Sequence, residues 1–205
     1  MCMKNFYVVL NGCKSIIMQP TKDIRSLYQI GDVFLFAFVG NIGDCKNQKQ
    51  VVDAFSLLSA EERKKIKVVF VGGGEVEMLR NYIKSKCLSD YLIVCGSVPQ
   101  DDVHNFYCAA NATILTSKSE GFGLSIIEGM RYGLPNLVFS DLPAVTDLYD
   151  ECAMLTIDKR TDEELSKKMV EMTECVWNRD AIKKHSDKFT LEEMANNYIQ
   201  VYKNL

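Results

Sequence analysis

The chain has 205 residues, 24 of them Lys or Arg and 27 Asp or Glu, which gives a formal net charge of −3. This length allows one large domain or two small ones, and it is enough to bury a sizeable core. Hydrophobic residues make up 47% and charged residues 25%, a mixture typical of a soluble globular protein. The acidic balance argues against a general nucleic-acid binder, which needs a basic surface to neutralise phosphates.

Neither a membrane span nor a signal peptide is visible in the sequence. The most apolar run, residues 33–39, is far below the roughly 20 residues that a membrane-spanning helix needs. The eight cysteines are widely scattered without a Cys-x-x-Cys pair, so we interpret them as reduced thiols and expect no metal site. We therefore expect a cytoplasmic protein that binds no nucleic acid and has no transmembrane segment, with peripheral membrane contact left open.

Short apolar runs alternate with helical patterns along the chain. Residues 6–10 predict a first strand, which the Asn11-Gly12 turn ends, and the run 33–39 predicts a strand buried on both faces. The elements predicted next are a helix at 47–58, a short helix opened by the capping box from Ser59 to Glu62, a strand at 66–71, a helix at 75–86 and a strand at 91–95. The remaining predictions are a helix at 101–110, a strand at 112–116, a helix at 123–132, strands at 135–139 and 153–157, and two helices opened by capping boxes at Thr161 and Thr190.

This alternation of strands and helices predicts a doubly wound α/β fold of the Rossmann type, with a mostly parallel sheet covered on both faces. We find no internal repeat and no linker, so we expect a single domain over residues 1–205, with a helical tail from about residue 161. In such folds ligands bind at the carboxyl ends of the strands. The loops that follow strands are therefore the place to look for a functional site.

The loop after the predicted strand 112–116 carries two acidic residues eight positions apart, Glu120 and Glu128. Between them, Gly121 and Gly123 allow close backbone approach to a ligand, and the helix that starts near Gly123 offers free N–H groups to an anion. A phosphate bound there would lie about 7 Å along the helix axis from Glu128. This spacing fits a nucleotide sugar, but it also fits an ordinary helix N-terminus with Glu120 stabilised by the dipole and Glu128 in solvent.

The segment from Glu120 to Glu128 resembles the Glu-x7-Glu motif of the retaining glycosyltransferases of family 4 with the GT-B fold, the glycosyl transferases group 1. Further landmarks of that family are similar to segments of this chain in the same order, namely 11–12, 39–41, 46–48, 71–75, 96–98, 133–135 and 189–192. The resemblance covers nearly the whole chain. It implies the C-terminal, donor-binding half of such an enzyme, and the N-terminal, acceptor-binding half has no counterpart here.

The resemblance implies a role for each matching residue. Glu128 would hold the ribose hydroxyls, and Glu120 the hydroxyls of the transferred sugar. Lys46 would neutralise the diphosphate, and we count Glu120 and Lys46 as the catalytic residues. The substrate-binding residues would also include Gly40, Asn41, Val98, Phe122, Gly123 and Leu124.

Within that set, the backbone N–H groups of Phe122, Gly123 and Leu124 would face the diphosphate, and the backbone at Val98 would contact the base. Asn41 departs from the family pattern, which usually carries Arg at this position. Asn can donate a hydrogen bond but supplies no charge.

The implied activity is transfer of a sugar from a nucleoside diphosphate donor, UDP- or GDP-linked, with retention at the anomeric carbon and without a metal or other cofactor. The acceptor would be a glycan or a lipid-linked sugar in polysaccharide biosynthesis. We expect the chain to be inactive or weak without an acceptor-binding partner. Two alternatives stay open: a non-catalytic nucleotide-sugar-binding module or subunit of a split enzyme, and an isomerase resembling the GT-B nucleotide-sugar 2-epimerases.

Overall fold

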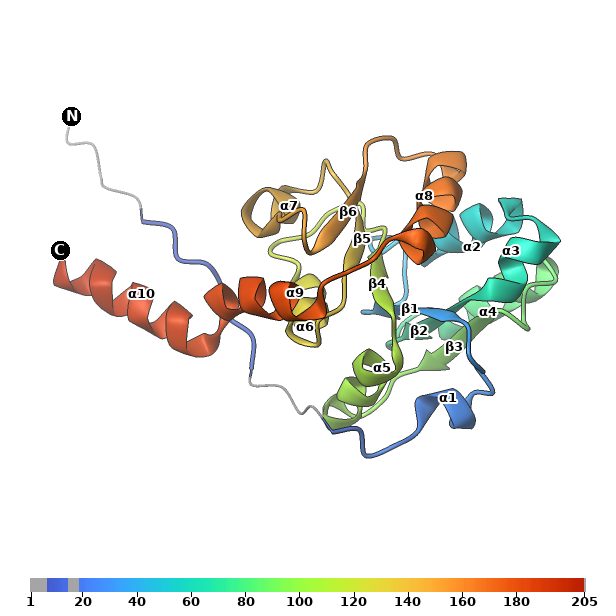
Figure 1. The fold of residues 1–205 in the computed structure, drawn as a ribbon, viewed down its shortest axis with the longest axis horizontal. Helices are drawn as coiled ribbons and strands as arrows, with labels where there is room; N and C mark the ends of the chain where they lie inside the picture. Colours follow the sequence, from blue (N-terminus) through green and yellow to red (C-terminus); the bar gives the residue numbers. More distant parts are fainter. Residues whose placement is uncertain (1–6, 15–18, 205) are drawn as a thin grey trace.

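The structure, a computed structural model that describes residues 7–14 and 19–204, contains a six-stranded sheet (Figure 1). Every strand pair is parallel, and the strand order is β3-β2-β1-β4-β5-β6. The strands are β1 (Phe34–Val39), β2 (Ile66–Val71), β3 (Leu92–Gly96), β4 (Ala112–Leu115), β5 (Asn136–Phe139) and β6 (Met154–Ile157). With helices on both faces, the sheet confirms the predicted doubly wound, Rossmann-like fold.

Strand β1 shows why the apolar run 33–39 becomes a central strand. Successive side chains of a strand point to opposite faces of the sheet. Phe36 and Phe38 pack in a cluster with residues of α2 (Gln48–Leu57) and α4 (Val76–Ser85), whereas Leu35 and Ala37 pack with α1 (Ile24–Leu27) and α5 (Val103–Ala109). All four are at most 1% exposed. The strand is apolar throughout because both of its faces are covered.

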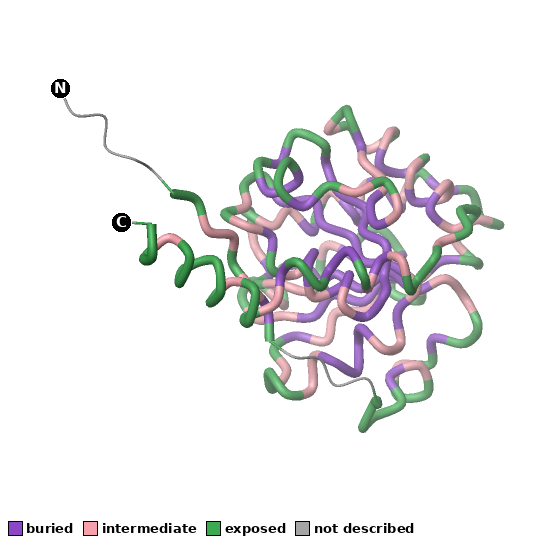
Figure 2. Tube along the Cα trace, turned by 60° about the vertical axis from the view of Figure 1, so that its left-hand side comes forward, coloured by how far each residue is buried: buried purple, intermediate pink, exposed green. Residues whose placement is uncertain are grey.

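The other helices complete the two outer layers and the C-terminal part of the chain. They are α3 (Ala60–Lys65), α6 (Leu124–Arg131), α7 (Pro143–Leu148), α8 (Asp162–Glu174), α9 (Arg179–Ser186) and α10 (Leu191–Lys203), with short 3₁₀ helices at η1 (Gln100–Asp102) and η2 (Asp187–Phe189). Helix α8 packs against α2, and α9 packs against α6. Figure 2 shows the buried residues concentrated in the sheet and on the inner faces of these helices.

Three helix starts follow the predicted capping patterns. Ser59 and Glu62 form a complete capping box at α3. The side chains of Thr161 and Thr190 accept hydrogen bonds from the backbone N–H groups three residues later, at the starts of α8 and α10. Each cap satisfies an N–H group that has no partner within its own helix.

The prediction of a strand at residues 6–10 is wrong for residues 7–10. Residues 7–10 form no strand, and residue 6 lies outside the described residues. The neighbouring segment instead makes a single parallel bridge between Cys13 and Thr190, with the Cys13 N–H donating to the Phe189 carbonyl at 2.8 Å. Tyr7 and Val8 are 45% and 86% exposed, so the apolar character of this run does not place it in the sheet.

The region from residue 161 onward is helical but not uniform. Helix α8 buries Leu165, Met169 and Met172 in the main core. Helix α10 buries no residue and extends away from the sheet beside the N-terminal segment (Figure 1). The first part of this region therefore belongs to the packed body, and only the last helix projects from it.

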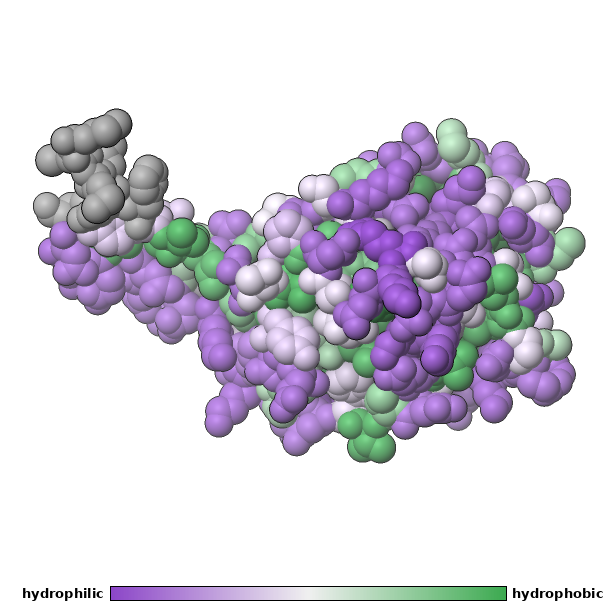
Figure 3. Space-filling model, turned by 90° about the horizontal axis from the view of Figure 1, so that it is seen from above, coloured by the Kyte–Doolittle hydropathy of each residue, from purple (hydrophilic) through white to green (hydrophobic). Residues whose placement is uncertain are grey.

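The face of the molecule in Figure 3 is mainly hydrophilic, with hydrophobic side chains in small groups between polar ones. Among the described residues, no helix combines the length and the hydrophobicity that crossing a membrane requires.

Candidate functional site

Two loops meet at the carboxyl edge of the sheet, because β1 and β4 are neighbours and parallel. Residues 40–47 follow β1, and residues 116–123 follow β4. The Thr116 hydroxyl donates to the carbonyl oxygens of Lys46 and Asn47 at 3.2 and 2.9 Å, and the Lys118 N–H donates to the Cys45 carbonyl at 2.8 Å. These bonds hold the two loops in one fixed arrangement.

Glu120 lies in the second loop and is held from both loops. Its Oε1 accepts a hydrogen bond from the Ser117 hydroxyl at 2.6 Å and forms an ion pair with the Lys46 ammonium. The Glu120 side chain is only 9% exposed and that of Lys46 25%. Because an ionised carboxylate is costly to bury unpaired, Lys46 and Ser117 together stabilise Glu120 in this position.

Glu128 lies on α6 and points toward α5. The Tyr107 hydroxyl donates to Glu128 Oε2 at 2.8 Å, and the Tyr107 ring stacks on Tyr132 with centroids 5.3 Å apart. Burial raises the pKa of Glu128, and the Tyr107 hydrogen bond opposes that rise by favouring the charged form. Burial also raises the pKa of Tyr107 well above its ordinary value, so this hydroxyl stays protonated and donates.

The N-terminal end of α6 depends on Gly123. This residue has φ +76°, and a Cβ built on it would lie 2.9 Å from Ile126 Cδ1 and 3.3 Å from Ala144 Cβ. A side chain there would be strained by the backbone and crowded by its neighbours. Within the described residues, the N–H groups of Leu124 and Ser125 have no hydrogen-bond acceptor, so they remain available to an anion.

A cavity of about 500 Å³ joins these features. Of the residues that the sequence predicts, Gly40, Asn41, Lys46, Glu120, Phe122, Gly123, Leu124 and Glu128 line this cavity together. Val98 is not among its lining residues; it is half-buried and packs against the cluster around Phe106. Gln100, two positions further on, does line the cavity, and the predicted contact of the Val98 backbone with a base stays a prediction.

Three contributors to the site escape sequence reasoning: Ser117, Tyr107 and Arg160. Arg160 holds the Asp141 carboxylate through Nε at 2.7 Å and donates from Nη1 to the Ser117 carbonyl at 2.9 Å. Arg160 precedes α8, far from Ser117 in the sequence, so no local pattern marks the contact. The sequence pattern places Tyr107 on the inward face of a helix, but this position does not reveal that its hydroxyl donates a hydrogen bond to Glu128.

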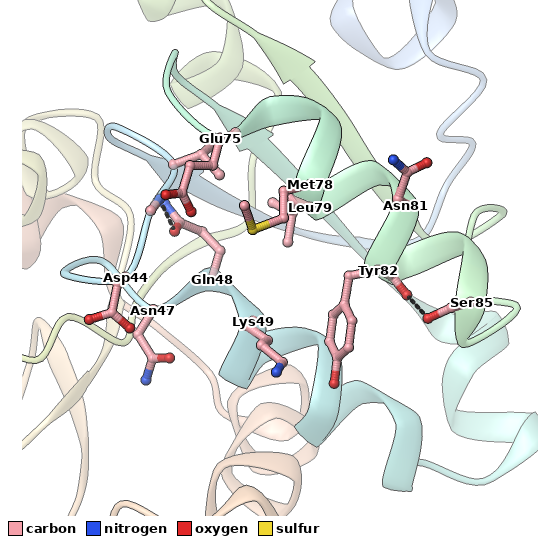
Figure 4. Close-up of a pocket in the computed structure, with 12 residues that line it drawn as sticks. Asp44, Asn47, Gln48, Lys49, Glu75, Met78, Leu79, Asn81, Tyr82 and Ser85 are labelled. Atoms are coloured by element: carbon pink, nitrogen blue, oxygen red, sulfur yellow. Dashed lines mark hydrogen bonds between the residues drawn. The ribbon is translucent and has the colours of Figure 1, made fainter.

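A separate cavity of about 580 Å³ lies between α2 and α4 (Figure 4). Met78, Leu79 and Tyr82 from α4 face Gln48 and Lys49 from α2 across it. Its buried polar side chain, Gln48, is already engaged, since it accepts from the Gly43 N–H and donates to the Asn41 carbonyl. The carboxylates that line this cavity, Asp44 and Glu75, lie outside the segment from Glu120 to Glu128, and we do not assign the cavity to the candidate site.

Comparison with curated proteins identifies relatives of the chain. It is 24% identical over 181 residues to the O-antigen chain mannosyltransferase B of Escherichia coli, an alignment that covers 86% of this chain and 47% of that protein. It is 31% identical over 140 residues to the D-inositol 3-phosphate glycosyltransferase of Acidothermus cellulolyticus, which covers 62% of this chain and 31% of that protein. The chain thus spans at most about half the length of these relatives.

Solved structures show the same fold. The apo form of the lipopolysaccharide outer core galactosyltransferase WaaB matches with a TM-score of 0.74 at 20% identity, over 97% of this chain and 56% of that one. Anabaena HepE in complex with UDP and glucose matches with a TM-score of 0.75 at 19% identity, over 97% and 57%. The family model described as "Glycosyl transferases group 1" matches residues 21–189, most of the sequence. The chain therefore belongs to the glycosyl transferases group 1.

Proposed function

We propose that this chain binds a nucleoside diphosphate sugar, as the donor-binding half of a retaining glycosyltransferase. The observation that carries the proposal is the cavity that joins Glu120, Glu128, Lys46 and the N-terminal end of α6. An anionic diphosphate matches Lys46 and the free N–H groups of the helix. Ribose and sugar hydroxyls match the two carboxylates, which accept hydrogen bonds.

In this proposal each part of the ligand has its own partner. Glu128 accepts from the ribose hydroxyls, and Glu120 from the hydroxyls of the sugar. The N–H groups of Phe122, Gly123 and Leu124 face the diphosphate, beside Lys46. The first loop supplies two further contacts at Gly40 and Asn41, which line the same cavity. The base would then extend toward the segment that contains Val98 and Gln100.

The proposed reaction proceeds on one face of the sugar. The bond between the anomeric carbon and the diphosphate oxygen breaks, and its electron pair stays on the diphosphate. The oxygen of an acceptor hydroxyl forms a bond to the anomeric carbon on the same face, and its proton passes to the departing diphosphate. Lys46 and the N–H groups of α6 stabilise the negative charge that grows on the leaving group without reorganising solvent.

The comparisons support sugar transfer over isomerisation, because the family model describes glycosyl transferases and the two curated relatives are named for transfer. HepE has been solved with UDP and with UDP-glucose, which supports a uridine diphosphate donor as the first ligand to test. The names of the Escherichia coli relatives concern O-antigen, so a polysaccharide or lipid-linked acceptor is the acceptor class that we propose.

Calorimetric titration of the chain with UDP, GDP and ADP tests the proposal. We expect one of these nucleotides to bind the wild-type chain, and Glu128→Gln to weaken its affinity about tenfold or more, because the charged acceptor of the ribose hydroxyls is lost. Absence of binding by the wild-type chain at millimolar concentration would show that the site is assigned wrongly.

A stability measurement separates lost binding from lost folding in Glu128→Gln. Burial raises the pKa of Glu128 in the folded state, so its ionised form costs stability above that raised value. Removing the charge should leave the urea midpoint at pH 7 equal to or above that of the wild type. Any gain should disappear as the pH falls below about 4.3, where the carboxyl is protonated in both states. A lower midpoint at pH 7 would contradict this reasoning.

A further inference from the structure

The two motif carboxylates share a feature that the motif itself does not specify: each is held through one oxygen only. Glu120 is held through Oε1, and Glu128 through Oε2. Among the described residues, Oε2 of Glu120 and Oε1 of Glu128 have no hydrogen-bond partner. Neither of these two oxygens is a buried atom without a partner, and both residues line the candidate cavity. Each carboxylate therefore has a fixed side and an open side.

The fixed side of each carboxylate is held by a hydroxyl from outside the Glu-x7-Glu motif. Ser117 belongs to the segment that follows β4, and its carbonyl is itself held by Arg160 at 2.9 Å. Tyr107 belongs to α5 and is 2% exposed, with its ring stacked on Tyr132. Both hydroxyls are carried by residues that the fold already immobilises, so each can orient the carboxylate that it contacts.

We propose that Ser117 and Tyr107 are positioning residues, which fix one oxygen of Glu120 and Glu128 respectively and leave the other oxygen for a hydroxyl of the nucleotide-sugar donor. This inference rests on the proposed function and adds to it. A carboxylate offers about four acceptor sites, so the protein hydroxyl and a ligand hydroxyl are accommodated together. A carboxylate free to rotate would lose part of the orientation that binding requires.

The two positions act on different parts of the ligand. Tyr107 acts through Glu128, so its hydroxyl matters for the ribose. Ser117 acts through Glu120, so its hydroxyl matters for the transferred sugar. Glu128 also lines a second cavity. The other titratable groups that line one of the two cavities, and that could change how Glu128 binds a ligand, are Cys13, Lys14, Lys46, Asp101, His104, Glu120 and Tyr132. None of them is altered by the two substitutions used below.

Tyr107→Phe tests the first position, because it removes only the hydroxyl and keeps the stacked ring. We measure the affinities of UDP, GDP and ADP and of their 2′,3′-dideoxy analogues by calorimetry. We expect a loss of about tenfold for the ribonucleotide and none for the dideoxy analogue. Tyr82→Phe is the matched control, because the Tyr82 hydroxyl also donates to a carboxylate, that of Asp53 at 2.5 Å, away from the candidate cavity. It should change neither affinity.

Ser117→Ala tests the second position, with Ser117→Thr as the variant that keeps a hydroxyl. We compare the affinity of UDP-glucose or GDP-mannose with that of the corresponding nucleoside diphosphate. Ser117→Ala should reduce the sugar-linked affinity about tenfold and leave the nucleoside diphosphate within about twofold. Ser117→Thr should restore the sugar-linked affinity.

The outcomes distinguish the two levels of inference. A wild-type chain that binds none of the nucleotides overturns the proposed function and the positioning roles with it. A wild-type chain that binds, with Tyr107→Phe losing equal affinity for the ribonucleotide and its dideoxy analogue, overturns the role of Tyr107 alone. A sugar-linked affinity unchanged in Ser117→Ala overturns the role of Ser117 alone.

Discussion

Among the described residues that line the candidate cavity, Lys46 is the sole one with a cationic side chain. The family that the sequence resembles usually has Arg at the position of Asn41, so in the proposed function this site binds a diphosphate with less positive charge. The Lys46 ammonium also forms an ion pair with Glu120, which neutralises part of its charge. The backbone N–H groups at the start of α6 therefore carry a larger part of the proposed anion binding here than in relatives with two cations.

Gly123→Ala tests how strongly that helix start depends on its glycine. The new Cβ meets Ile126 Cδ1 at 2.9 Å, and φ +76° is a conformation that Ala adopts at a cost of about 1–2 kcal/mol. We expect a lower urea midpoint that corresponds to at least this cost, together with weaker nucleotide binding, because the N–H groups of Leu124 and Ser125 shift.

Gly121→Ala is the matched control in the same loop. A Cβ at Gly121 meets nothing within 4 Å, and its φ lies outside the left-handed range. Its free energy of unfolding should stay within about 0.5 kcal/mol of the wild type. Equal losses of stability in the two variants would mean that the loop responds to any added side chain, and that the conformation at Gly123 is not what matters.

At the scale of elements, α8 is the clearest case of a helix that belongs to the core. Met169 is 0% exposed and packs in the main cluster, although it lies in the region that the sequence suggests as a helical tail. Met169→Ala should therefore lower the free energy of unfolding by about 2–5 kcal/mol. Met78→Ala, at a residue 64% exposed on α4, should change it by no more than about 0.5 kcal/mol. Similar urea midpoints for the two variants would show that α8 docks only loosely.

The elements that the sequence predicts best are those with a strong local signal. The runs that become β1 and β2 are apolar because both sheet faces are covered, and the Ser59 and Thr190 caps are local hydrogen bonds. The four-residue helix α1 is too short to show a period, and α9 is predominantly polar. Residues 7–10 are apolar as well but form no strand: Tyr7 and Val8 are exposed, and the bridge to Thr190 is made further along, by Cys13.

The residues of the candidate site differ in the same way: some have a local sequence signal, and others depend on contacts between elements. The spacing of Glu120 and Glu128 around Gly123 is local, so the sequence predicts that Glu120 lies in the loop and Glu128 on the helix that starts near Gly123, and the structure places them there. The meeting of Lys46 with Glu120 follows from β1 and β4 being neighbours in a parallel sheet. Tyr107 and Ser117 depend on side-chain geometry between elements, which no pattern of residue types encodes.

At the scale of the whole molecule, the candidate site lies at one edge of the sheet and is lined mainly by the loops that follow the strands and by α6. In the proposed function, these elements supply partners for a diphosphate, a ribose and a sugar. The described residues that line this cavity include no second group of carboxylates or cations that would orient an acceptor hydroxyl toward the anomeric carbon. Binding of the donor and positioning of the acceptor are therefore separable functions in this proposal.

That separation predicts how the 205-residue chain behaves in a transfer assay. Holding the donor and the acceptor in reactive geometry lowers the activation barrier of such a reaction by about 7–11 kcal/mol. In this proposal, the chain alone would hold only the donor. We expect labelled UDP-glucose or GDP-mannose to bind, with sugar transfer to added glycan or lipid-linked acceptors slow or undetectable. The measurement is incorporation of label into the acceptor, with a Glu120→Gln variant as the background. Rapid transfer that depends on the acceptor and disappears in Glu120→Gln would refute the separation, and it would mean that this edge of the sheet also orients the acceptor.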